Sequence, residues 1–291
     1  MTAVAAAQTG EAIGPAWPSR LRRPATHLAI LATLLALWEI GVRAEWLNPL
    51  FFPRPTAIVE SFVRITVIQG NLWPNLYVTL WEVFAGFLAG SILGVGLAIA
   101  VGLSPLLTRF LKPYVIVLEA TPRIALAPLI IAALGFGWAS KIAIVMLVCF
   151  FAPFVNTLSG MLQVEAEKLE MFRAMRAGRL QIFFKLMLPD ALPIILAGLR
   201  LALAASLSGA LVAEFISANE GMGLLLKRYT ASLNMASSFA CLLTLTAIGF
   251  LLFRSMEALD ARIVFWRHPQ RADAVGRRRA AAWRKRFGDR P

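Results

Sequence analysis

The chain has 291 residues, of which 59% are hydrophobic and 15% are charged, and its formal net charge is +13. Soluble domains are about half apolar, whereas the apolar excess of this chain lies in runs of about 20 residues, long enough to cross the hydrocarbon core of a bilayer. The composition therefore excludes an ordinary soluble domain and indicates an integral membrane protein. Both cysteines lie inside apolar runs, and no cluster of His, Cys and carboxylate residues suggests a catalytic metal, so we expect no metal site and no bound cofactor.

The apolar runs predict an all-α membrane protein with about six transmembrane helices. In chain order, the runs cover 28–43, Val83–Leu103, 113–134, Ile142–Val164, 191–213 and a part of Tyr229–Phe253. We therefore expect a transmembrane domain over 28–255. A partly disordered cytoplasmic segment, 1–27, would precede it, and a basic cytoplasmic tail, 256–291, would follow it.

The second run carries small residues at every fourth position, namely Gly86, Gly90 and Gly94. This spacing places the three glycines on one face of a helix, where the absence of side chains permits another helix to approach closely. The sequence therefore predicts that this face is buried against a neighbouring span.

The positions of lysine and arginine predict the orientation. If the N-terminus is cytoplasmic, the large majority of the 29 basic residues fall on the cytoplasmic side. The positive-inside rule then places both termini in the cytoplasm, together with the charged segment between the fourth and fifth runs. The arginines near the C-terminus are typical of a tail that contacts anionic lipid, and we do not expect nucleic-acid binding.

The charged segment, here called the 165–189 loop, has helical periodicity although it cannot lie in lipid. Its apolar positions form two stripes at helical spacing, the first being Leu169, Phe172 and Met175, and the second Leu180, Phe183, Phe184 and Met187. A break at Ala177-Gly178 and an end at Pro189 predict two helices joined by a turn. Such a hairpin offers an apolar side to a soluble partner; an interfacial hairpin that only anchors the loop is the alternative.

The spacing from Glu170 to Leu188-Pro189 resembles the EAA loop of permeases of ATP-binding-cassette importers. The family pattern is Glu-Ala-Ala, then a Gly, then Leu-Pro, and the following ALPIILAGLRLAL is also similar. Arg176 stands at the position of the family glycine, which would move the turn to Gly178.

Other segments extend the resemblance over roughly 50–267. FFPRPTAIVESF, TLWEVFAGFLAGSILGVGLAIAVGLS and VAEFISANEGMGLLL are similar to the nitrate, sulfonate and taurine branch of that family. TPRIALAPLIIAALGFGWASKIAIVMLVCFFAPFVNTLSGM also resembles relatives for thiamine-pyrimidine precursors. Several matches in the same order make the resemblance more specific than any one of them.

The resemblance implies a type I (MetI-like) permease fold in a bacterial inner membrane, with the 165–189 loop as a coupling helix in a groove of a cytoplasmic ATPase dimer. It also implies an extracytoplasmic solute-binding protein. The positions that it assigns to coupling are Leu169, Glu170, Met171, Phe172, Arg173, Ala174, Met175, Arg176, Gly178, Leu188 and Pro189. The chain has no G-x-x-x-x-G-K-[ST] phosphate loop, so ATP and Mg²⁺ would be used by the separate ATPase. Six spans without an internal repeat favour a homodimer around a shared pathway.

Charged residues within the apolar runs are candidates for the translocation pathway. Glu119 and Arg123 are four apart on the third run, which would let them pair on one helix face, and Arg200 lies about ten residues into the fifth. An arginine at such depth can attract an anion, or it can be neutralised internally or extend toward an interface. The sequence leaves both interpretations open.

The function that these observations favour is the permease subunit of a binding-protein-dependent importer. A secondary transporter or channel that works without ATP is the alternative. A membrane enzyme is less consistent with the sequence, because the runs contain no recognisable catalytic constellation. The substrate stays open between a nitrate, sulfonate or taurine-type anion and a thiamine-pyrimidine precursor.

Overall fold

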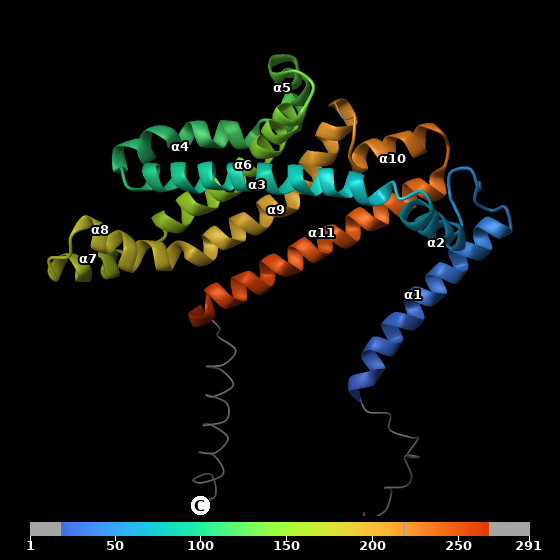
Figure 1. The fold of residues 1–291 in the computed structure, drawn as a ribbon. Coiled ribbons are helices and arrows are strands. Elements are labelled where there is room, and N and C mark those ends of the chain that lie inside the picture. Colours follow the sequence, from blue (N-terminus) through green and yellow to red (C-terminus); the bar gives the residue numbers. More distant parts are fainter. Residues whose placement is uncertain (1–18, 218, 268–291) are drawn as a thin grey trace, which may run out of the picture.

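The computed structural model describes residues 19–217 and 219–267, and every regular element within them is helical (Figure 1). Within these described ranges, five helices are long and apolar enough to cross a membrane. They are α1 (Ser19–Arg43), α3 (Leu72–Gly102), α6 (Trp138–Leu162), α9 (Leu188–Ser217) and α11 (Met235–Ile263). The shorter helices are α2 (Pro55–Val63), α4 (Pro105–Ala120), α5 (Ala127–Leu134), α7 (Ala166–Ala174), α8 (Arg179–Ile182) and α10 (Met222–Ala231). The expected all-α membrane fold is confirmed.

The third predicted span is divided into two helices. α4 ends at Ala120, and a 3₁₀ turn, Arg123–Leu126, leads into α5. The chain leaves the helix at Thr121 because the ring of Pro122 disfavours the helical conformation of the residue before it. In Figure 1, α4 runs beside α3 and α5 turns away from it.

The centre of the fold is the packing of α3, α6 and α9, which cross one another in Figure 1. The glycine face of α3 lies against α6, as predicted. A Cβ atom on Gly90 would lie 2.6 Å from the carbonyl oxygen of Met146, and one on Gly198 of α9 would lie 2.9 Å from that of Ala152. At both crossings the backbones approach so closely that only glycine fits without displacement.

Helix α1 stands apart from this core and contacts the rest of the described chain at its C-terminal end. Trp38 packs against Phe239 of α11 with ring centroids 6.0 Å apart. Glu39 accepts a hydrogen bond of 3.0 Å from the Thr56 hydroxyl on α2. Much of the apolar surface of α1 is therefore left exposed within this single chain.

The predicted domain boundaries differ from the helices at both ends. α1 begins at Ser19, within the expected N-terminal segment, and α11 continues to Ile263, within the expected tail. The last turns of α11, beyond residue 255, still pack on the bundle, where Met256 is buried. The expected disorder of the first residues and the arginine-rich end of the tail lie outside the described residues.

Candidate functional site

The 165–189 loop folds as α7, a tight turn, the short helix α8 and a π-helical turn, Phe183–Met187. It lies at the far end of the bundle from α5 and α10 (Figure 1). The ammonium of Lys168 lies 3.1 Å from the carboxylate of Glu165 within the loop and 3.8 Å from that of Asp190 at the start of α9. The second contact ties the loop to the next span. The hydrogen bond to Glu165 raises the pKa of Lys168 above its ordinary value.

The turn after α7 is a Schellman motif centred on Arg176. The N–H of Ala177 donates to the carbonyl of Phe172 at 3.0 Å, and the N–H of Arg176 donates to that of Arg173 at 2.9 Å. Arg176 has a φ of 55°, the left-handed conformation that glycine adopts most easily. The expected shift of the turn to Gly178 is therefore wrong, because the left-handed residue stays at the family glycine position although an arginine occupies it.

Gly178 has a different role, because it precedes the first residue of α8 in an extended conformation with a φ of −68°. Its N–H donates a hydrogen bond of 2.9 Å to the side-chain oxygen of Gln181, which satisfies one of the free donors at the start of the helix.

The sequence predicted that the second helix ends at Pro189, and this prediction is wrong. Helical structure continues without a break from Arg179 to Ser217, so the loop runs directly into the fifth span. Just before the proline, the N–H of Leu188 donates to the carbonyl of Phe183, five residues back. This wider π turn, together with the position of Pro189 at the start of α9, accommodates a residue that cannot donate a backbone hydrogen bond.

The two predicted apolar stripes do not form one surface. Phe183 is buried among Met161, Ala191 and Ile195 of the bundle, whereas Leu169 lines a cavity on the bundle side of the loop. The apolar side chains that remain well exposed are Met171, Met175, Leu180 and Phe184, between 54% and 73%. Helical spacing alone could not separate these groups, because the bundle covers one side of each helix.

The loop and the ends of α3 and α6 line this cavity, here called the inner cavity, which is partly open and has a volume of about 640 Å³. Its polar lining comes from Arg173 and Arg179, which stand on opposite sides of the turn.

The three candidate pathway residues do not meet at one site. Arg200 forms an ion pair with Asp260 of α11, and its guanidinium lies 5.7 Å from the ring centre of Phe253. Arg123 lies over the ring of Phe151 at 4.9 Å, in the geometry of a cation–π contact. The expected Glu119–Arg123 arrangement on one helix is wrong because α4 ends at Ala120, and the side chain of Glu119 lies outside the description.

A buried polar cluster at the outer end of the bundle was not predicted. It consists of Thr79 and Glu82 of α3, Lys141 of α6 and Glu214 of α9, all at most 4% exposed. Glu82 and Lys141 form an ion pair. Glu214 accepts hydrogen bonds from the Thr79 hydroxyl at 2.6 Å and from the N–H of Gly223 at 2.5 Å. Because Gly223 is in the first turn of α10, the carboxylate of Glu214 also faces the positive end of that helix.

The available signal for this cluster was the position of both acids within apolar sequence, TLWEVF and LVAEFI. A lone carboxylate within an apolar run needs a partner once it is buried, but local sequence does not say which residue provides it.

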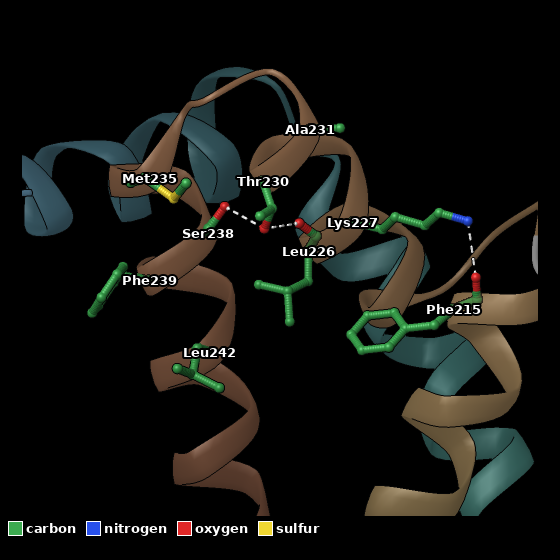
Figure 2. A pocket seen from close by; sticks show the side chains of 9 residues that line it. All are labelled: Phe215, Leu226, Lys227, Thr230, Ala231, Met235, Ser238, Phe239 and Leu242. Carbon is green, nitrogen blue, oxygen red and sulfur yellow. Dashed lines mark hydrogen bonds between the residues drawn. The ribbon is translucent and has the colours of Figure 1, made fainter. Parts of the chain in front are cut away.

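An outer pocket of about 610 Å³ lies between the end of α9, α10 and the start of α11 (Figure 2). Phe215 and Leu226 contribute to its apolar wall. The ammonium of Lys227 donates a hydrogen bond of 2.9 Å to the carbonyl oxygen of Phe215, and the hydroxyls of Thr230 and Ser238 are 3.3 Å apart. These polar groups are already partnered within the chain, so the pocket offers apolar surface rather than free donors.

Comparisons with known proteins agree with this architecture. Residues 86–265 match the family described as "Binding-protein-dependent transport system inner membrane component". A taurine transport system permease protein of Escherichia coli (strain K12) is 30% identical over 254 residues, which are 86% of this chain and 92% of that protein. A formylaminopyrimidine transport permease protein of Halalkalibacterium halodurans is 30% identical over 81% of this chain and 94% of its own length.

Among solved structures, the fold is similar to a chain of the MetNI methionine ABC transporter in an inward-facing conformation. The TM-score is 0.58 at 18% identity, and the match covers 68% of this chain and 97% of that one. Fold, family match and relatives therefore agree with the resemblance seen in the sequence. The chain belongs to the inner-membrane permease components of binding-protein-dependent ATP-binding-cassette importers, and it is a multi-pass protein of the plasma membrane.

Proposed function

We propose that this permease receives mechanical work from a cytoplasmic ATPase through the exposed side of the 165–189 loop. The observation that carries the proposal is the group of four exposed apolar side chains Met171, Met175, Leu180 and Phe184 at the cytoplasmic end of the bundle. Exposed apolar groups on an ordered element outside the membrane are typical of a docking surface. Glu170 and Arg176 are exposed as well and can form ion pairs at the rim of a groove.

The unbroken helix from the loop into α9 supports this role. Because α8, the π turn and α9 are continuous, a displacement of the loop moves the fifth span as a rigid lever. The ion pair of Lys168 with Asp190 holds α7 to the same lever. ATP and Mg²⁺ would be bound by the ATPase, and this chain would supply the pathway rather than a catalytic centre.

The substrate that we propose is a small sulfonate such as taurine, with a thiamine-pyrimidine precursor as the second candidate. The taurine and formylaminopyrimidine permeases are both 30% identical to this chain, but the taurine permease matches 86% of it and the other 81%. Of the two arginines, Arg123 is the better pathway candidate because Asp260 already neutralises Arg200. A second copy of the chain would complete the pathway, and much of the apolar surface of α1 is free to contact it.

The experiment is reconstitution of the full chain in liposomes with its cognate ATPase and solute-binding protein. Uptake of labelled taurine should require ATP, and competition with an alkanesulfonate or a formylaminopyrimidine ranks the substrates. Glu170→Lys should abolish co-purification of the ATPase. Glu167→Lys reverses a charge on the same helix at a position outside the predicted coupling set, and it should leave co-purification intact. Uptake by the chain alone, without ATP, would establish the alternative of a secondary transporter or channel.

A further inference from the structure

The inner cavity lies where two spans end and the 165–189 loop begins. Gly102 and Leu103 at the end of α3 form one wall, and Met161 and Leu162 at the end of α6 form another. The loop covers the cavity from the cytoplasmic side. It therefore sits at the depth where lipid headgroups meet the hydrocarbon of the cytoplasmic leaflet.

Two guanidiniums line the cavity, and no carboxylate in the described part of the chain pairs with either. Arg173 on α7 and Arg179 at the start of α8 are both exposed and both line the cavity. Neither forms an ion pair with a carboxylate of the described residues, unlike Lys168 in the same loop. Two unpaired arginines on opposite sides of one turn can hold a phosphate, because each guanidinium presents a planar set of donors that matches its oxygens.

The remainder of the lining is apolar, and a small soluble anion would leave that apolar surface in contact with water. Leu103 and Leu162 are 51% and 54% exposed, so apolar surface continues from the cavity toward the outside of the bundle. A ligand that satisfies both parts carries a phosphate at one end and hydrocarbon at the other. Anionic lipids are enriched in the cytoplasmic leaflet, and basic pockets at that level bind their headgroups.

We propose that the inner cavity binds an anionic phospholipid of the cytoplasmic leaflet, with its phosphate between Arg173 and Arg179 and its hydrocarbon against Leu103 and Leu162. The bound lipid would lie behind the loop, on the side opposite the exposed Met171, Met175, Leu180 and Phe184. The inference does not rest on the proposed coupling function, because lipid binding is a property of this chain alone.

The test is native mass spectrometry of the full-length chain in detergent, titrated with phosphatidylglycerol or with phosphatidylcholine of the same acyl chains. Wild type should retain phosphatidylglycerol in preference to phosphatidylcholine. The double variant Arg173→Gln/Arg179→Gln should bind phosphatidylglycerol about 25-fold more weakly, since each cation near an anionic headgroup contributes about fivefold. Lys185→Gln removes a charge from the same loop outside the cavity, and it should bind as wild type does.

A second variant keeps both arginines and changes only the shape. Leu103→Trp places a larger side chain in the cavity, and it should weaken phosphatidylglycerol binding while circular dichroism shows unchanged helicity. Equal binding of the two lipids, equal losses in Lys185→Gln and the double variant, or wild-type affinity in the double variant would each overturn the proposal. Displacement of phosphatidylglycerol by equimolar glycerol 3-phosphate would also overturn it, because the site would then bind a soluble anion.

Discussion

The hydroxyl of Thr79 on α3 donates a 2.6 Å hydrogen bond to the carboxylate of Glu214 on α9, although 135 positions separate the two residues. The same hydroxyl accepts the N–H of Met222 at the start of α10 across 2.8 Å. One buried side chain therefore joins three helices at the outer end of the bundle. The arrangement fixes α10 to α3, whose residue Thr79 is 143 positions before Met222.

Thr79→Val should destabilise the protein by about 2 kcal/mol, because it leaves a buried carboxylate oxygen and a buried N–H without a partner. The measurement is thermal unfolding of the purified chain in detergent. Thr246→Val is the matched control, since the Thr246 hydroxyl is exposed on α11 and bonds only to its own helix at the carbonyl of Leu242. Equal melting temperatures for the two variants would contradict the role of Thr79.

Gly90→Ala should cost about 1–3 kcal/mol of stability, because its Cβ would meet the backbone oxygen of Met146 and push α3 away from α6. Gly96 lies on the same helix with nothing within 4 Å of a Cβ atom. Gly96→Ala should therefore raise stability by up to about 1 kcal/mol through helix propensity. The two variants are compared by thermal unfolding, and a loss in both would show that close packing is not the cause.

Arg176→Gly should make the turn of the 165–189 loop more stable, because a left-handed conformation costs a non-glycine residue about 1 kcal/mol. Hydrogen exchange of the loop amides is the measurement, and slower exchange around Ala177 is the expected result. Arg173→Gly also replaces an arginine by glycine, but within helix α7, so it should accelerate exchange. Faster exchange in Arg176→Gly would show that the arginine side chain contributes more than the backbone strain costs.

Arg200→Gln and Asp260→Asn should each lower stability by about 1–2 kcal/mol, and the double variant should lose clearly less than the sum. Both side chains are about a quarter exposed, so the partner left behind is only partly solvated. Chemical unfolding in the four combinations gives the coupling energy. The exposed pair of Arg254 and Glu257 should show a coupling of only a few tenths of a kcal/mol.

The double variant Arg200→Gln/Asp260→Asn also distinguishes two roles for Arg200, a structural one and one in the translocation pathway. If Asp260 neutralises Arg200 as a structural tie, the double variant should recover transport activity together with stability in the reconstituted system. Recovery of stability without recovery of uptake would instead assign Arg200 to the translocation pathway.

The sequence by itself identified the long apolar helices that can cross the membrane, except that its third run is divided into α4 and α5, and it predicted the cytoplasmic side for the 165–189 loop. An uncharged run of about 20 residues has no other stable environment, and a loop with several arginines cannot enter lipid. The glycine face of α3 was predictable for the same kind of reason, since its spacing of four residues is a property of the helix alone. These predictions depend on interactions with solvent, lipid or the same helix.

Only the tertiary structure decided which polar and charged side chains pair with each other. The partners Glu82 and Lys141, Thr79 and Glu214, and Arg200 and Asp260 each lie on different helices. Their pairing depends on how the helices cross, and no local pattern encodes that crossing. The same reason explains why helical periodicity identified the apolar side chains of the loop but not which of them, such as Phe183, the bundle would bury.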